Sequence, residues 1–195
     1  MLYLLLHSSV LLAADVSISS SDSIQVAIGN ASSGDVLILS SGTYSECLNT
    51  SGKNITIRGD SVSTTIIDGS ACSTNSVEII GGENVIFEDV SLKNTSGRVF
   101  SVEGSILTLE NVNVSDSGSN SVNGPVVNAS DNANVTINNS TFEDNGASST
   151  SGTAKGGSIY IDDGVNLTIN NSTFNDSYAY KGGVIFALNN SSIVI

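Results

Sequence analysis

The sequence predicts an all-β fold, a right-handed parallel β-helix or solenoid, from three observations. Ser, Asn and Gly together make up about two fifths of the 195 residues, and charged residues make up only 13%. Val, Ile and Leu recur in short stretches that alternate with polar residues, as in half-buried strands. Similar stretches end at Leu92, Val114, Phe142 and Phe174, at spacings of 22, 28 and 32 residues. Short strands repeated at this spacing indicate a stack of coils.

The charge balance excludes other classes of protein. The chain has six Lys and Arg residues and nineteen Asp and Glu residues, which gives a net charge of −13. No stretch of the sequence contains several cations close together. Nucleic-acid binding is therefore not expected, because the chain repels phosphate. Charged residues are too few for a helical bundle, and the 39% apolar content is too high for a disordered acidic tail.

Residues 1–14 carry no charged side chain and are mostly apolar. The stretch is too short to span a membrane and resembles a secretory signal peptide that ends at Ala13-Ala14. A first apolar strand or a cap is the alternative. The two cysteines, Cys47 and Cys72, then favour a disulfide in an oxidising compartment, with two buried free thiols as the alternative. Because His7 is the only histidine, a Cys/His metal site is excluded.

The first coils begin with an expected helix. Residues 23–28 place Ile24, Ala27 and Ile28 on one helical face, which suits a short amino-terminal cap over the open end of a strand stack. Short strands are then expected in residues 34–39, 42–46, 54–59 and 65–69.

Two interleaved sets of segments define the later coils. Each member of the first set holds two short strands around a polar break, and the last two members agree at seven of eight positions; the set is 85–92, 107–114, 135–142 and 167–174. The second set is 99–102, 126–129, 159–161 and 185–188. Each coil thus holds about three strands, and Phe142 should contact Phe174 with Val114 beneath. The pairs Asn138-Asn139 and Asn170-Asn171 fall at one corner and should form an amide ladder along the axis. A β-sandwich is less favoured because Asn-Gly hairpin signals are sparse.

The chain ends within a strand-like stretch, residues 191–195. Because solenoids need a cap at each end, we expect residues 15–195 to form one β-helix domain that continues in a longer protein.

Short motifs in residues 107–195 carry a family resemblance. Phe142-x-x-Asn145 and Phe174 alternate with two Gly-Gly pairs, Gly156-Gly157-x-Ile159 and Gly182-Gly183-x-Ile185. This alternation resembles the repeats of chlamydial-type polymorphic outer membrane proteins, which pair Gly-Gly-Ala-[Ile/Leu/Val] with Phe-x-x-Asn. Here Ser177 stands in place of the second Asn, and neither Gly-Gly pair is followed by Ala. The resemblance implies a cell-surface β-helix passenger that contributes to adhesion. Read from the residues alone, each Gly-Gly is a corner where a side chain would clash, and the phenylalanines fill the core.

The opening coils also bear on an enzymatic role. The order of the opening coils resembles pectin-lyase-like β-helix proteins, and Gly42-x-Tyr44-x-Glu46 matches a motif near the start of pectin methylesterases. The catalytic residues that this resemblance implies further along the chain are not visible. The best carboxylate pair, Asp162-Asp163, precedes Gly164 and is expected to form a turn. Lys155 and Lys181 each precede Gly-Gly, which suggests one stacked corner. No catalytic, cofactor-binding or metal-binding residue is predicted.

Fifteen Asn-x-Ser/Thr sequons occur, which is more than chance would produce. They permit N-glycosylation, and the candidates are Asn54, Asn94, Asn113, Asn139 and Asn171. The repeated Asn-Asn-Ser-Thr also generates sequons by itself, so both interpretations stay open.

The sequence as a whole predicts a non-enzymatic protein, secreted or on the cell surface (extracellular or outer membrane), with an adhesin-like, passenger or stalk role. Its expected partner is a cell-surface or polysaccharide ligand, and no cofactor is expected. Membrane attachment would need an anchor outside this chain. The alternative is the amino-terminal part of a carbohydrate-active β-helix enzyme whose catalytic coils lie beyond residue 195.

Overall fold

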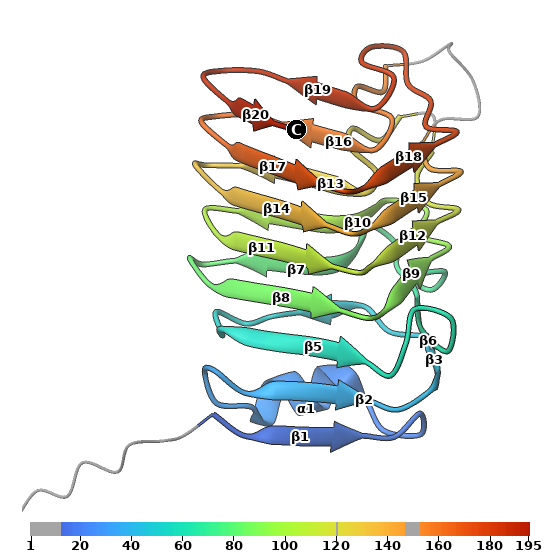
Figure 1. Cartoon of the computed structure of the whole chain (residues 1–195), viewed down its shortest axis with the longest axis vertical. Coiled ribbons are helices and arrows are strands. Elements are labelled where there is room, and N and C mark those ends of the chain that lie inside the picture. The colour runs from blue at the N-terminus through green and yellow to red at the C-terminus, as the bar shows by residue number, and fades with distance from the viewer. Residues whose placement is uncertain (1–12, 120, 147–152) are drawn as a thin grey trace, which may run out of the picture.

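The computed structural model is a right-handed parallel β-helix in which successive coils stack along one axis (Figure 1). It describes residues 13–119, 121–146 and 153–195. Most of the predicted signal peptide, residues 1–12, lies outside the described residues. The predicted fold class is confirmed, including three strands per coil and the cap helix.

Three parallel sheets form the walls of the solenoid. The first sheet contains β1 (Asp15–Ile18), β2 (Val36–Leu39), β5 (Ile55–Gly59), β8 (Asn84–Glu88), β11 (Ile106–Glu110), β14 (Asn134–Asn138), β17 (Asn166–Asn170) and β20 (Ser192–Val194). The second contains β3 (Gly42–Tyr44), β6 (Thr65–Asp68), β9 (Ser91–Lys93), β12 (Asn113–Ser115), β15 (Thr141–Glu143) and β18 (Thr173–Asn175). The third contains β4 (Leu48–Asn49), β7 (Asn75–Ile80), β10 (Arg98–Glu103), β13 (Val127–Ser130), β16 (Ile159–Ile161) and β19 (Ile185–Ala187).

The amino end of the solenoid is capped by α1 (Ile24–Asn30), which lies between β1 and β2 (Figure 1). Ser23 is its N-cap residue and accepts a hydrogen bond from the backbone of Val26. Ile24 and Ile28 are completely buried against the first coil, as their spacing on one helical face predicts. Among the described residues, no helix is long and apolar enough to cross a membrane.

The register of the strands matches the sequence repeats. In the second sheet Val114 pairs with Phe142, and Phe142 pairs with Phe174 one coil further on. The two phenylalanine rings stack with their centroids 4.6 Å apart and their planes 13° from parallel. Alternate residues of each strand therefore form continuous apolar columns inside the solenoid.

Asparagines form the corner between the first and second sheets. Asn139 and Asn171 adopt left-handed backbone conformations, with φ of 51° and 48°. The Asn170 amide donates a hydrogen bond to the side-chain oxygen of Asn138 at 2.9 Å. This confirms one rung of the predicted amide ladder, whereas the Asn139 amide donates to the Glu110 carboxylate at 2.6 Å and forms no second rung with Asn171.

The glycines of the two Gly-Gly pairs differ in whether a side chain would fit at their position. A Cβ atom at Gly156 would collide with the carbonyl of Ile159, and one at Gly157 would collide with the carbonyl of Gly183. Gly182 is restricted in the same way by the carbonyl of Ile185. A Cβ atom at Gly183 meets no atom within 4 Å, so the steric reason given for this glycine in the motif does not hold.

Candidate functional site

The motif that resembles the start of pectin methylesterases organises the first coils. The Tyr44 hydroxyl lies 3.1 Å from the carbonyl oxygen of Ile18 and 2.9 Å from that of Ser40. Gly42 lies so close to Ser20 that a Cβ atom would collide with its side chain. Both residues therefore fix the path of the chain around the first coil.

Glu46, the third residue of this motif, caps the amino end of α1. Its carboxylate accepts hydrogen bonds from the backbone N–H of Ile24 at 2.8 Å and of Gln25 at 3.1 Å. It also accepts one from the Ser23 hydroxyl at 2.6 Å. The two backbone N–H groups are left without a partner by the first turn of any helix, and a negative charge is favoured there. The whole Gly-x-Tyr-x-Glu motif thus has a structural role in this chain.

Replacing Glu46 with alanine is expected to lower the free energy of unfolding by about 2 kcal/mol, because three donors lose a charged acceptor. Urea unfolding followed by circular dichroism measures the loss. Glu143→Ala is the matched control, since Glu143 is an exposed strand residue. Equal losses in the two variants would contradict the capping role.

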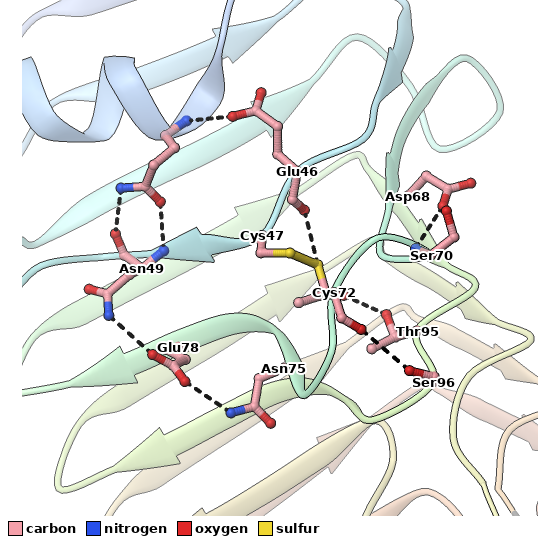
Figure 2. The surroundings of a disulfide bond; sticks show 12 residues. Glu46, Cys47, Asn49, Asp68, Ser70, Cys72, Asn75, Glu78, Thr95 and Ser96 are labelled. Atoms are coloured by element: carbon pink, nitrogen blue, oxygen red, sulfur yellow. Dashed lines mark hydrogen bonds between the residues drawn. A yellow bond between two sulfur atoms is a disulfide. The ribbon is translucent and has the colours of Figure 1, made fainter.

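A disulfide joins Cys47 and Cys72, whose Cα atoms lie 5.7 Å apart in adjacent coils (Figure 2). The backbone carbonyl of Glu46 lies 3.6 Å from the Cys72 sulfur. Two residues after Cys47, the Asn49 N–H donates to the side chain of Gln25 in α1 at 2.7 Å. The cap helix, its carboxylate cap and the disulfide therefore form one connected unit.

The Phe-x-x-Asn motif also proves structural. Asn145 is only 1% exposed, and its side chain bonds to the coil below through the Ser117 N–H at 3.1 Å and the Val114 carbonyl at 2.9 Å. At the equivalent position one coil further on, the Ser177 hydroxyl contacts that of Ser158 at 2.7 Å. The residues of this motif therefore hold neighbouring coils together.

Outward side chains of the last coils form the candidate site, which we call the Tyr160 cluster: Lys155, Tyr160, Asp162, Phe186 and Asn189. Tyr160 in β16 and Phe186 in β19 are register partners, with ring centroids 6.0 Å apart and planes within 8° of parallel. The Lys155 ammonium lies 5.4 Å from the centroid of the Phe186 ring. Both rings are half-buried, so part of each remains open to solvent.

Polar groups complete the Tyr160 cluster. The Tyr160 hydroxyl donates to Oδ2 of Asp162 at 3.0 Å, and the Asn189 amide donates to Oδ1 of the same carboxylate at 2.6 Å. Burial, followed by this hydrogen bond to Asp162, raises the pKa of Tyr160 above its ordinary value. The hydroxyl therefore stays protonated at neutral pH. The expected turn at Asp162-Asp163 is present, since Asp163 is left-handed with φ of 52°.

Cations gather at the adjoining corner of the solenoid. Lys155 and Lys181 form a parallel backbone bridge, which confirms the predicted stacked corner. The Lys155 N–H donates to the Asn123 side chain at 2.9 Å, and the Asn123 carbonyl lies 3.3 Å from the Arg98 guanidinium. Half of the six cations of this strongly acidic chain thus lie along one corner.

Tyr160 and Phe186 are not among the site residues that the sequence predicts. The alternation in Ile159-Tyr160-Ile161 and Ile185-Phe186-Ala187 does point both rings outward, because the isoleucines point inward. Their contact depends on the register across the segment between them, which the alternation within each strand does not define.

The sequon asparagines differ in accessibility. Asn54, Asn94, Asn139 and Asn171 are exposed, whereas Asn113 lies within β12 and is half-buried. In the described residues, no group of three or more His, Cys, Asp or Glu side chains is placed to hold a metal ion.

Comparisons with known proteins bear on the fold. No family model matches the chain, and no curated protein matches its sequence. The solved structure of the pectin methylesterase PemA from Erwinia chrysanthemi is similar, with a TM-score of 0.50 and 12% identity, over 87% of this chain and 80% of that one. Two pectin methylesterase–hexasaccharide complexes align with 14% identity and a TM-score of 0.48, and the aligned region covers 81% of this chain and 66% of each of those chains. At this identity the likeness concerns the fold alone, a pectin-lyase-like parallel β-helix.

Proposed function

We propose that this chain is a non-enzymatic, extracellular β-helix with an adhesin-like role, and that it binds a cell-surface polysaccharide through the Tyr160 cluster. The observation that carries the proposal is the pairing of two outward aromatic rings with a lysine, a carboxylate and an amide. In register below Tyr160, the same column continues through Asn128, Ser101 and Glu78, which are all polar. The aromatic pair is therefore a local departure from a polar surface.

The chemistry of the cluster suits a sugar. The negative face of an aromatic ring attracts the C–H groups of a pyranose ring, which carry a slight positive charge. A carboxylate accepts hydrogen bonds from sugar hydroxyls, and an ammonium or amide donates them. Aromatic residues are also enriched at interaction surfaces. The exposed rings of Tyr178 and Tyr180 add further aromatic surface along the same coils.

The resemblance of residues 107–195 to polymorphic outer membrane protein repeats supports the adhesin-like part of the proposal. In this interpretation Phe142, Asn145 and the glycine corners build the scaffold, and the outward side chains bind. The proposal also includes secretion, for which the signal-like amino end and the disulfide are the support.

Replacing Tyr160 or Phe186 with alanine is expected to weaken polysaccharide binding roughly tenfold or more, as for other aromatic anchors. The measurement is binding of the secreted protein to an immobilised glycan panel and then to cells that carry the glycans to which the wild type binds. Thr136→Ala is the control, because Thr136 points outward on the first sheet, away from the cluster. If all three variants bind like the wild type, the Tyr160 cluster is not the binding site.

The second candidate is the amino-terminal part of a carbohydrate-active enzyme, with catalytic coils beyond residue 195. The pectin-lyase-like fold favours it, whereas the structural roles of Tyr44 and Glu46 remove one of its motifs. Incubating the full-length gene product with the polysaccharides that bind, and assaying chain cleavage and methyl-ester release, separates the two. Cleavage or demethylation of any of these polysaccharides would favour the enzymatic function over the adhesin-like one.

A further inference from the structure

Within the part of the chain that the structure describes, the hydrogen bonds of the solenoid begin at Ala14. Its N–H donates to Oδ1 of Asp35 at 2.8 Å, and its carbonyl accepts from the N–H of Val36 at 2.9 Å. Oδ2 of Asp35 accepts from the Ser32 N–H at 2.8 Å. Asp35 is only 5% exposed, so its carboxylate depends on these donors. The bonds from Ala14 and then Ser32 hold its pKa below the ordinary value.

The two bonds of Ala14 distinguish the possible places at which a leader could be removed. Hydrolysis after Ala14 would take away both bonds, leaving Oδ1 of Asp35 and the N–H of Val36 without these partners, which is unfavourable for buried groups. Hydrolysis after Ala13 would keep both. It would also convert the Ala14 amide into an α-ammonium, a stronger donor to a carboxylate.

We propose that the leader is removed between Ala13 and Ala14, and that the new α-ammonium of Ala14 forms an ion pair with Asp35. Water supplies the oxygen for the new carboxylate of Ala13, and the released amine of Ala14 takes up a proton at neutral pH. Ala13 provides the small residue that signal peptidases require before the cut. When β1 pairs with β2, the carboxylate of Asp35 receives the processed end. This inference rests on secretion, which is part of the proposed function.

The first experiment expresses the chain from Met1 in a bacterial and a eukaryotic secreting host and determines the mass and amino-terminal sequence of the exported protein. A chain that begins at Ala14 is the expected result. Export of a chain that begins at Asp15, or at any other residue, would overturn the inference while leaving secretion intact. Retention of the unprocessed chain in both hosts would instead contradict the secretion on which it rests.

The second experiment tests the ion pair in the exported protein. Selective acetylation of the α-amino group should lower the melting temperature by about 2–4 °C, the shift that corresponds to roughly 1 kcal/mol in a protein of this size. The same treatment should have no effect in Asp35→Asn. Asp15→Asn, which removes a neighbouring exposed carboxylate, should respond like the wild type. An unchanged melting temperature after acetylation of the wild type would disprove the pairing.

Discussion

Replacing Phe142 with alanine is expected to lower the free energy of unfolding by about 3–5 kcal/mol, one of the two largest effects in this chain. The ring is completely buried in β15 and lies in one column between Val114 and Phe174. Removing it leaves a cavity that neighbouring coils cannot fill, because their backbones are fixed by sheet hydrogen bonds on both sides. The stacking contact with Phe174 is lost as well.

Urea unfolding monitored by circular dichroism measures this loss, and two variants make it specific. Phe142→Leu keeps most of the volume and should cost less than about 2 kcal/mol. Phe186→Ala removes a ring of the same size from the outer face, where solvent already reaches it, and should cost less than Phe142→Ala. If Phe142→Ala and Phe186→Ala cost the same, the column of Phe142 is not the well-packed core that its burial indicates.

The same column explains why the fold could be predicted from the sequence. In residues 135–142 and 167–174, inward and outward positions alternate without interruption on both sides of the Asn-Asn corner. A shift of one residue would turn Phe142 outward, so burial of the apolar face leaves one register. Segments that match at seven of eight positions then stack on each other, which makes the repeat in the sequence a repeat in space.

The contacts between different coils could not be predicted in the same way. Glu46 appears in the sequence as part of a family motif, and only the structure brings its carboxylate to the first turn of α1. Tyr160 and Phe186 are separated by 26 positions that include a full coil, and their pairing depends on how that coil closes. Sequence periodicity defines the direction of a side chain, whereas its neighbours from other coils depend on loop lengths.

Removing the disulfide, with Cys47→Ser and Cys72→Ser together, is expected to lower the free energy of unfolding by about 3–4 kcal/mol. This figure is the loop-closure entropy for a bridge between cysteines 25 residues apart. The bridge restricts the unfolded chain over one coil. In the native state it also joins the segment that carries Glu46 to the next coil. Chemical denaturation of the double variant, beside the wild type with and without a reductant, measures the loss.

The position of the disulfide predicts which elements lose stability when it is removed. Besides Glu46, α1 is held by the Lys53 ammonium, which donates to the carbonyls of Ile28 at 2.8 Å and Gly29 at 2.6 Å. Because these contacts come from the segment that the bridge anchors, hydrogen exchange should accelerate in α1 and β4 of the double variant before it does in β14 and β17. Uniform acceleration along the whole solenoid would mean that the bridge acts only on the unfolded state. Acceleration confined to the first coils would show that it also secures the cap, without which the strand edges of the first coil would lie open.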